Sequence, residues 1–445
     1  MKSPRIVIVG AGFGGLQAAQ SLANSGADIV LIDRHNYHTF IPLLYQIATS
    51  QLEPEYIAYP IRTILRRFSA KRHTRKPKVR FCMAEVQRVD FSAQIVETNR
   101  SAIAYDFLVL ATGCQTQFLG VSGASEHAFA LKTLEEAITL RNQILSCLER
   151  ASQESNPLRR EQLLTFIIVG GGPTGVEMAG ALVEMLQSKL RQDYPSLNLE
   201  QVRLILVQSG DRLLANLPKK LGVYTYKRLR QLGVKIYLET KVSQVTQGSV
   251  HLENHEVIPA ATVIWTAGLE ANPPETSEEL SSAKKGKLLV HPTLQLLEQP
   301  NVYAIGDLAY VEQKGKPLTG VAPEALQEGV AVARNIQRQL QGKSPKPFKY
   351  FNKGRLAIIG CYSGVGKIGG WAFTGFLAWL MWLGVHLVYL PGYRNRLLVL
   401  LTWLYTYLMG DRAVRLIISG KNVKAQNYQA LPQDKLDFFQ ESQSK

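Results

Sequence analysis

Residues 5–33 read RIVIVGAGFGGLQAAQSLANSGADIVLID, and this stretch decides the fold. A short β-branched run ends in Gly10, a glycine-rich turn follows, and a second apolar run ends in Asp33. This pattern predicts a buried parallel strand, a helix from about Gly14 to Ser25 and a second strand. The three elements form a βαβ unit at the start of the chain.

The glycines of the turn predict a dinucleotide site, and they are Gly10, Gly12, Gly14 and Gly15. Gly10 permits the tight turn, Gly12 lets the backbone approach a pyrophosphate, and Gly15 lets the helix pack closely on the strand. The helix N-terminus then offers free N–H groups to the phosphates. Asp33 ends the second strand, where a carboxylate can bind a ribose diol. The alternative is a structural glycine turn without a ligand.

A second copy of the pattern begins at residue 165, TFIIVGGGPTGVEMAGALVEML, with glycines at Gly170, Gly172 and Gly175. Two units imply two nucleotide ligands, or one dinucleotide site and a decayed copy. The strand that follows ends in Gln208, where the first unit has Asp33. A carboxylate there would bind the 2′-hydroxyl of NADH and repel the 2′-phosphate of NADPH, so glutamine permits NADPH use.

Glu177 and Arg212 are two further candidates in this second unit. We place Glu177 in the first turn of its helix, where it either pairs with the helix dipole or lies near a nicotinamide. Arg212 lies four residues after Gln208 and could meet a phosphate, although an exposed arginine beside a loop is usually just solvated.

The C-terminal third is apolar and aromatic. Residues 371–390, WAFTGFLAWLMWLGVHLVYL, contain no Asp, Glu, Lys or Arg, PGYRNR interrupts the run at 391–396, and 397–409 are again apolar. The first run is long enough to span a bilayer, but it could also lie in the interface, with Trp and Tyr at headgroup depth. A buried hairpin or a dimer interface is the alternative. Four of the five tryptophans fall here, which favours a membrane surface: Trp371, Trp379, Trp382 and Trp403.

The totals restrict the class of protein. A chain of 445 residues suits two or three domains, and 46% hydrophobic with 19% charged residues excludes general disorder. The net charge of +16 suits an anionic lipid surface or a nucleic acid, but the chain has no nucleic-acid recognition motif. The basic stretch 62–80 is interpreted as a solvated surface insertion, with membrane contact as the alternative.

The cysteines and the N-terminus bear on location. Cys82, Cys114, Cys147 and Cys361 form no CxxC pair, so we expect no metal site and no disulfide framework. The N-terminus enters a strand without an apolar leader, so we expect no signal peptide.

The chain resembles the flavoproteins with two dinucleotide-binding domains, which are pyridine nucleotide-disulfide oxidoreductase-like, and among them the type II NAD(P)H:quinone oxidoreductases. The stretches that carry this resemblance are IVIVGAGFGG, YHTFIPLLYQIAT, LVLATG, FIIVGGGPTGVEMAGAL, NVYAIGDLA and GVAPEALQEG. The C-terminal stretch 376–408 resembles the membrane-binding region of this family. FIPLLYQ and the C-terminal stretch are the most specific, because many reductases share the glycine motifs.

The resemblance implies FAD on the first unit and NAD(P)H on the second. It assigns to FAD the residues Asp33, Thr112, Gly113, Gly306 and Asp307, and to the nicotinamide cofactor Gly170, Gly172, Gly175 and Glu177. The quinone motif of the family, AQxAxQ, corresponds here to residues 322–327, APEALQ. Its quinone residues are then Pro323, Ala325 and Gln327, and Pro323 replaces the first glutamine of the motif.

We therefore predict an α/β fold with two Rossmann-like dinucleotide-binding domains and a C-terminal membrane-binding helical region. The FAD-binding domain is predicted to be discontinuous, because NVYAIGD must return to the FAD. The predicted boundaries are 1–115 and 275–345 for the FAD domain, 116–274 (core about 155–270) for the NAD(P)H domain, and 346–445 for the membrane-binding region.

The predicted activity is transfer of two electrons from NADH or NADPH through FAD to a membrane quinone, without proton pumping. The flavin carries the reactivity, so no side chain is expected to act as a catalytic acid or base. We expect a peripheral membrane protein on the cytoplasmic or equivalent inner face, and a homodimer stays open.

Several rivals share these features. A disulfide reductase needs a cysteine pair that the region after the first unit lacks. A sulfide:quinone reductase could use Cys114 and Cys361. Reduction of a biosynthetic naphthoquinone precursor and a membrane-associated redox-sensing flavoprotein complete the alternatives.

Overall fold

The computed structural model describes residues 3–69, 79–188, 190–198, 201–412 and 414–418. The chain divides into two compact units. Unit 1 comprises Met1–Thr39, Ala58–Gln115 and Leu269–Lys353, and unit 2 comprises Phe40–Ile57, Thr116–Gly268 and Gly354–Lys445. This division differs from the predicted boundaries in three respects, and the smallest is that unit 1 resumes at Leu269 instead of 275. The segment 40–57 groups with the second unit, and most of the C-terminal region, from Gly354 onward, belongs to that unit instead of standing apart.

Unit 1 is built on a five-stranded parallel sheet in the order β22-β9-β1-β2-β5. The strands are β22 (Val302–Ala304), β9 (Phe107–Leu110), β1 (Arg5–Val9), β2 (Asp28–Asp33) and β5 (Val79–Met83). All residues of β9 and all but Arg5 of β1 are buried, because other elements cover both faces of the sheet.

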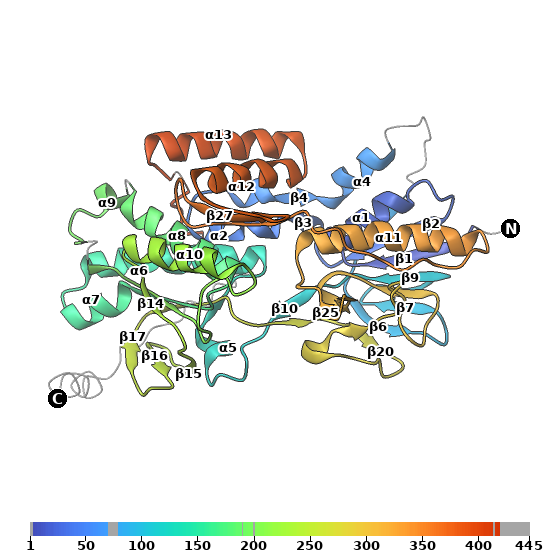
Figure 1. The fold of residues 1–445 in the computed structure, drawn as a ribbon, viewed down its shortest axis with the longest axis horizontal. Coiled ribbons are helices and arrows are strands. Elements are labelled where there is room, and N and C mark those ends of the chain that lie inside the picture. The colour runs from blue at the N-terminus through green and yellow to red at the C-terminus, as the bar shows by residue number, and fades with distance from the viewer. Residues whose placement is uncertain (1–2, 70–78, 189, 199–200, 413, 419–445) are drawn as a thin grey trace. The chain divides into compact units, whose positions relative to one another are not determined.

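Helices cover one face of this sheet and a second sheet covers the other. Helices α1 (Phe13–Leu22) and α11 (Ala322–Leu340) lie side by side in Figure 1. They approach closely because both have glycine at the contact: a Cβ on Gly329 would lie 2.5 Å from the Gly14 carbonyl oxygen. The second sheet has the order β20-β6-β7-β8. Its strands are β20 (Glu275–Thr276), β6 (Val86–Asp90), β7 (Ile95–Thr98) and β8 (Ala102–Ala104).

Unit 2 repeats the parallel sheet in the order β11-β18-β12-β13-β14. The strands are β11 (Phe129–Ala130), β18 (Thr262–Trp265), β12 (Thr165–Val169), β13 (Arg203–Val207) and β14 (Lys235–Tyr237), and its main helices are α6 (Leu134–Gln153), α8 (Pro173–Gln187) and α10 (Lys219–Gln231). A capping box fixes the start of α6, because the Thr133 hydroxyl accepts from the Glu136 N–H while the Glu136 carboxylate accepts from the Thr133 N–H.

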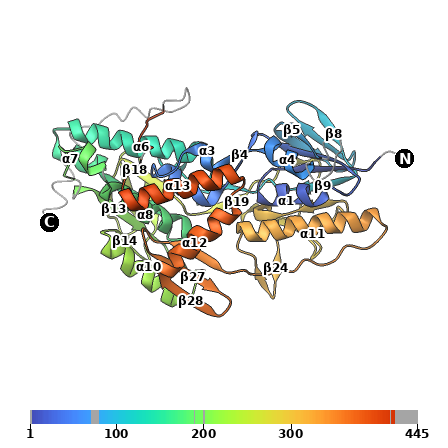
Figure 2. The same ribbon diagram turned by 90° about the horizontal axis from the view of Figure 1, so that it is seen from above.

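The C-terminal elements pack on α8. Three antiparallel strands, β26 (Arg355–Ile358), β27 (Gly364–Ile368) and β28 (Trp371–Gly375), lead into α12 (Phe376–Tyr389) and α13 (Tyr393–Met409). Figures 1 and 2 show α12 and α13 as neighbouring helices, with α12 along the β26–β28 sheet. The turn after β26 touches α8 through glycine, since a Cβ on Gly180 would lie 2.6 Å from the Gly360 nitrogen.

The apolar run 371–390 divides between two elements: its first five residues form β28, and Phe376–Tyr389 form α12. Within the described ranges, no helix is both long enough and apolar enough to cross a membrane. The expected surface insertion 62–80 lies partly outside the described residues, which stop at Ser69 and resume at Val79. Residues Ile61–Ser69 form helix α4, which buries Ile61 and Leu65, and β5 begins at Val79.

The tryptophans do not form an interfacial belt. Trp379, Trp382 and Trp403 are 6%, 0% and 2% exposed, and of the four only Trp371, at 83%, faces solvent. The indole rings fill the space between the C-terminal helices and the rest of unit 2, and two of their N–H groups bind buried polar side chains. Three of the four clustered tryptophans therefore do not support a membrane surface. Other residues of α12 and α13 are exposed.

Candidate functional site

The first glycine loop has the geometry of a phosphate cradle. Gly10 has φ +100°, and a Cβ there would lie 2.3 Å from the Ala111 carbonyl oxygen. A Cβ on Gly15 would lie 1.8 Å from the Gly10 oxygen, so α1 can approach β1 only with glycine at this position. A Cβ on Gly12 meets no described atom within 4 Å, which leaves open space in front of the N-terminus of α1.

The side chain of Asp33 holds this loop from the end of β2. Its Oδ2 accepts the Ala11 N–H at 2.7 Å and its Oδ1 accepts the His35 N–H at 2.8 Å. Each carboxylate oxygen keeps a second lone pair for a ligand hydroxyl. His38, which was not among the predicted site residues, holds the loop as well: Nδ1 lies 2.9 Å from the Ala11 oxygen. Burial lowers the pKa of His38, so the ring is neutral at pH 7 and Nδ1–H donates.

The second glycine loop reproduces this arrangement in unit 2. Gly170 has φ +113°, and a Cβ on Gly175 would lie 1.9 Å from the Gly170 oxygen, while Gly172 again faces open space among the described residues. The Gly171 N–H donates to Gln208 Oε1 at 2.7 Å, the same bond that Ala11 makes with Asp33. Gln208 therefore occupies the structural place of the acid in the first unit.

Arg212, the candidate for binding a phosphate, makes its hydrogen bond within its own turn. Arg212 Nη2 donates to the Ala215 oxygen at 3.1 Å, and its Nε is buried without a hydrogen-bond partner. The guanidinium is thus partly satisfied within its own turn.

Gly306 and Asp307 lie beside α11 at the end of β22. The Gly306 N–H donates to Glu328 Oε2 at 2.6 Å, and the Cys114 thiol donates to Asp307 Oδ2 at 2.8 Å. A small cavity is lined by residues that include Gly306, Asp307, Ala325 and Glu328. Glu328 was missed by sequence reasoning. Burial raises its pKa to about 7.

The three residues of the quinone motif lie near the start of α11 and make different contacts. Ala325 lies with the loop residues, since a Cβ on Gly306 would be 3.5 Å from its Cβ. Pro323 stands in the first turn of α11. The Gln327 side chain forms two hydrogen bonds with the Phe351 backbone. Its Nε2 donates to the Phe351 oxygen and its Oε1 accepts the Phe351 N–H, both at 2.9 Å.

Thr112 and Gly113 form the turn after β9. The Thr112 hydroxyl donates to the Asn272 oxygen at 2.6 Å, and the Asn272 N–H donates to the Gly113 oxygen at 3.2 Å. Both residues therefore tie this turn to the neighbouring segment.

Glu177 is buried, and it is the fifth residue of α8, so the placement in the first turn is wrong. The favourable pairing with the helix dipole falls with it, because that effect fades beyond the first turn. Its Oε1 accepts from Trp382 Nε1 at 3.1 Å and from the Ile358 N–H at 3.4 Å. Burial raises the pKa of Glu177 to about 8. The group is thus mainly protonated at pH 7.

The raised pKa of Glu177 makes stability depend on pH. The folded protein holds this proton up to about pH 8, whereas the unfolded chain releases it near 4.5. Its contribution to stability is complete below 4.5 and is lost as the pH rises through 8. We expect Glu177→Gln to flatten the fall of the unfolding temperature between about pH 5 and pH 8.5. Thermal unfolding at both pH values checks this, with exposed Glu312→Gln as control. Equal falls in the wild type and Glu177→Gln would contradict it.

Unit 2 exposes an apolar face on its last two helices. We use "apolar face" for the exposed large hydrophobic residues of α12 and α13, which include Phe376, Leu380, Val388, Leu397, Leu404 and Leu408. Leu408 and Val388 are 75% and 65% exposed. Large apolar residues gathered in this way on two neighbouring helices are typical of interaction surfaces.

Cys361 has no character of a reactive thiol. Burial, with Glu184 nearby, raises its pKa to about 12. A thiol that stays protonated at pH 7 is a poor nucleophile.

Two glycine loops, each closed by a polar side chain at the end of the second strand, define a protein with two dinucleotide-binding folds. A model of the pyridine nucleotide-disulphide oxidoreductase family matches residues 4–329. The chain is 37% identical to the type II NADH:quinone oxidoreductase Ndh of Mycobacterium tuberculosis, over 92% of this chain and 89% of that protein. It is 27% identical to the type II NADH:quinone oxidoreductase of Staphylococcus aureus, over 83% and 91%.

Solved structures agree on the fold. NDH2 from Plasmodium falciparum in complex with NADH matches with a TM-score of 0.85 at 19% identity, over 94% of this chain and 100% of that chain. The sulfide:quinone oxidoreductase of Aquifex aeolicus matches with a TM-score of 0.69 at 18% identity, over 92% and 96%. The chain therefore belongs to the pyridine nucleotide-disulphide oxidoreductases and, within them, to the type II NADH:quinone oxidoreductases. The predicted α/β fold and the predicted enzyme class are confirmed.

Proposed function

We propose that this protein transfers two electrons from NADH or NADPH, through FAD, to a membrane quinone, without proton pumping. The observation that carries the proposal is the pair of glycine loops, one closed by Asp33 and the other by Gln208. The similarity to type II NADH:quinone oxidoreductases over nearly the whole chain supports the same activity.

The loop of unit 1 fits the pyrophosphate of FAD. The open space at Gly12 is where a pyrophosphate can approach the backbone, and the Asp33 carboxylate would accept from the adenosine ribose. Gly10, Gly14 and Gly15 set the close packing around it, while Thr112, Gly113, Gly306 and Asp307 would hold the rest of the cofactor. Bound there, the flavin supplies the hydride acceptor and the two-electron donor to the quinone.

The loop of unit 2 fits the nicotinamide nucleotide. Gly170, Gly172 and Gly175 would cradle its pyrophosphate. Gln208 would bind the ribose without repelling a 2′-phosphate. Glu177, on the same helix, holds a proton on its carboxyl group at pH 7 and so places no negative charge beside the nicotinamide. The protein aligns two substrates and supplies no acid or base that must be regenerated.

Changing Gln208 to glutamate should shift the selectivity toward NADH. A carboxylate bonded to the Gly171 N–H would lie where the 2′-phosphate of NADPH binds, and two such charges repel by about 1–4 kcal/mol. The ratio of kcat/KM for NADPH to that for NADH should fall about tenfold or more. The matched control is Ser209→Glu, which adds the same charge at the next, exposed residue. Unchanged selectivity in Gln208→Glu would refute the role of Gln208.

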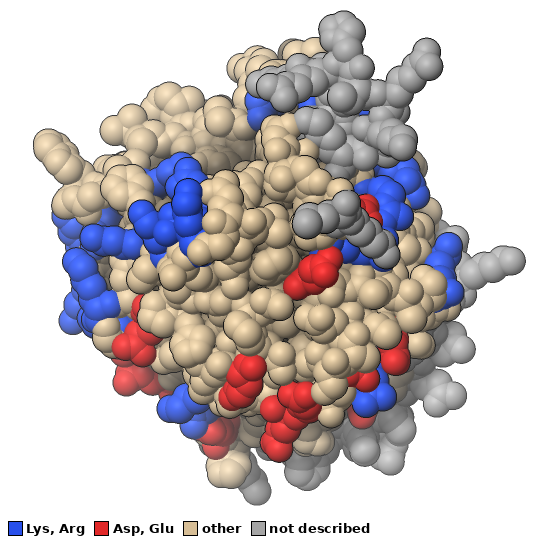
Figure 3. Space-filling view, turned by 90° about the vertical axis from the view of Figure 1, so that its right-hand side faces the viewer, with Lys and Arg blue, Asp and Glu red and all other residues tan. Residues whose placement is uncertain are grey.

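The apolar face fits a peripheral membrane contact that brings the enzyme to a quinone dissolved in the bilayer. We propose attachment to one leaflet, on the cytoplasmic or equivalent inner side. The charge of +16 supports an anionic lipid surface. Part of this positive charge comes from α4 of unit 1, which exposes Arg62, Arg66 and Arg67. Figure 3 shows Lys and Arg mainly in the upper part of one face and Asp and Glu mainly in the lower part.

Ala325 is the residue of the quinone motif that lies beside Gly306, which we propose to hold FAD. We therefore propose that Ala325 is the nearest of the three to the reacting quinone. Pro323 and Gln327 would shape the site through the helix start and the Phe351 contact. Steady-state oxidation of NADH and NADPH with a short-chain quinone tests the proposed function. Stoichiometric consumption of coenzyme and quinone supports it. A purified protein that binds FAD but reduces no quinone would refute it.

A further inference from the structure

Arg412 belongs to the short segment that follows α13, and its guanidinium is buried in unit 2. The side chain is 2% exposed. Nη1 donates to the Thr49 carbonyl oxygen at 2.6 Å, and Nη2 donates to Glu184 Oε2 at 3.0 Å. One side chain therefore joins three elements: the C-terminal segment, the turn that follows α2 (Leu44–Ala48), and α8.

The contact with Thr49 satisfies a helix end. The last carbonyls of a helix have no partner within the helix, and a cation near them is favourable. Ser50 has φ +59°, so the chain turns sharply after Thr49. Arginine presents its donors as a planar fork, which can reach a carbonyl and a carboxylate at once. Lysine offers a single point charge and is expected to keep only one of these contacts.

Glu184 lies on α8, the helix that also carries Glu177 and begins at the second glycine loop. Glu177 and Glu184 are seven residues apart on α8, so they share one face of the helix. Glu177 is bound by Trp382 of α12. On α2, Gln46 Oε1 accepts from Trp403 Nε1 of α13 at 2.8 Å. The C-terminal elements thus bind both α2 and α8 through buried polar contacts, and Arg412 hydrogen-bonds to the end of α2 and to α8 at once.

We propose that Arg412 is a positioning residue for the electron-transfer reaction. It fixes the end of α2 against α8 and thereby sets the spacing between the segment 40–52 and the helix that carries Glu177. The chain after α13 is then part of the scaffold of the site as well as a continuation of the apolar helices. This inference rests on the proposed function, because that function gives α8 its role in binding the nicotinamide.

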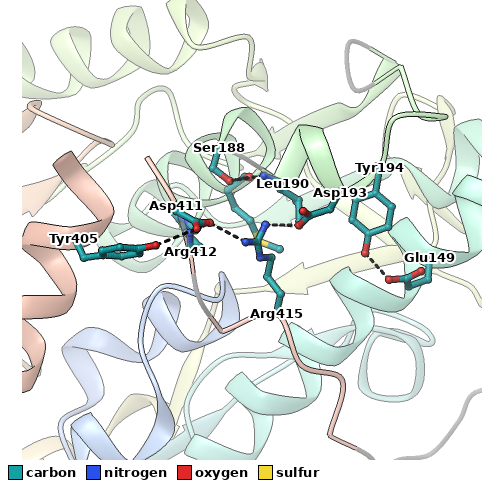
Figure 4. Close-up of polar contacts among 10 residues, drawn as sticks. Glu149, Ser188, Leu190, Asp193, Tyr194, Tyr405, Asp411, Arg412 and Arg415 are labelled. Carbon is teal, nitrogen blue, oxygen red and sulfur yellow. Dashed lines mark hydrogen bonds and ion pairs between the residues drawn. The ribbon is translucent and has the colours of Figure 1, made fainter. Parts of the chain in front are cut away.

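Arg415 provides a matched control in the same segment. Figure 4 shows its side chain between Asp193 and Asp411, and the bond to Asp411 measures 2.8 Å. Its side chain is 25% exposed, and Asp411 is only four residues earlier in the same segment. Such partly exposed ion pairs contribute little to stability. Arg415→Gln removes the same charge as Arg412→Gln and leaves the contacts of Arg412 with Thr49 and Glu184 intact.

The test compares Arg412→Gln, Arg412→Lys and Arg415→Gln in the full-length, FAD-loaded protein. Flavin content, binding to anionic vesicles and hydrogen exchange of the amides of residues 44–52 are measured beside kinetics with a water-soluble quinone. In Arg412→Gln we expect kcat to fall about tenfold to a hundredfold, since small displacements of a reacting site have effects of this size. The KM for NADH should stay within about twofold, because the glycine loop is untouched. Exchange at 44–52 should accelerate, and vesicle binding should be unchanged.

Arg412→Lys should fall between the wild type and Arg412→Gln, and Arg415→Gln should match the wild type in every measurement. If Arg412→Gln loses its flavin, Glu184→Gln replaces it, because that change keeps a hydrogen-bond acceptor and should give the same pattern with a smaller loss of kcat. Wild-type kcat and exchange in these variants would overturn the proposal, as would a loss confined to vesicle binding. An inactive wild type would instead overturn the proposed function.

Discussion

Gly15→Ala is expected to yield a protein that no longer retains FAD. The added methyl would lie 1.8 Å from the carbonyl oxygen and 3.0 Å from the carbonyl carbon of Gly10, which are backbone atoms that cannot rotate away. Helix α1 would have to move off β1, and the loop between them would lose the shape that receives a pyrophosphate. The ratio of flavin to protein, from the visible spectrum after gel filtration, checks this.

Gly12→Ala is expected to lower FAD binding without lowering the stability of the fold. Its methyl meets no described atom within 4 Å, so the unfolding temperature of the flavin-free protein should match that of the flavin-free wild type. The flavin content should nevertheless fall, because the methyl occupies the space proposed for the pyrophosphate. Gly370→Ala, also in open space but far along the chain from the loop, is the control and should keep its flavin. Full flavin content in Gly12→Ala would show that the pyrophosphate binds elsewhere.

Placing two aspartates on the apolar face should release the protein from membranes. Leu404 and Leu408 are 48% and 75% exposed, so Leu404→Asp/Leu408→Asp should not disturb the packing of unit 2. A leucine-to-aspartate change costs about 3 kcal/mol at the centre of a bilayer and less in the interface. We expect co-sedimentation with anionic vesicles to weaken by at least about tenfold.

The same variant should keep its activity with a water-soluble quinone, because the two leucines lie outside both glycine loops. Leu297→Asp, at an exposed leucine of unit 1, is the control for a charge placed elsewhere. Undiminished vesicle binding of the double variant would mean that another surface carries the membrane contact.

The local pattern around the glycine loops was readable from the sequence because each feature lies within one βαβ unit. The strands, the turns and the closing residues Asp33 and Gln208 follow from hydrophobic periodicity and from the spacing between glycine and strand end. The structure adds a detail that spacing cannot give: both side chains accept the N–H of the residue after the first glycine.

Contacts between distant segments could not be predicted in this way. Burial raises the pKa of Glu177, while its hydrogen bonds with Trp382 and Ile358, both far along the chain, lower it. The tryptophans looked interfacial by composition, whereas Trp382 and Trp403 are buried, and Glu177 and Gln46 accept hydrogen bonds from their N–H groups. In the sequence, Arg412 is only a basic residue that follows the apolar run 397–409. The association of residues 40–57 with unit 2 also depends on such long-range packing.

The most direct test of the account is single-turnover spectroscopy of the purified protein under anaerobic conditions. NADH, NADPH and sulfide are each mixed with the oxidised enzyme, and a short-chain quinone is added afterwards. The account predicts that a nicotinamide coenzyme bleaches the flavin absorbance rapidly, that the quinone restores it, and that sulfide does neither. Bleaching by sulfide alone, or a flavin that a nicotinamide reduces but no quinone reoxidises, would contradict the account.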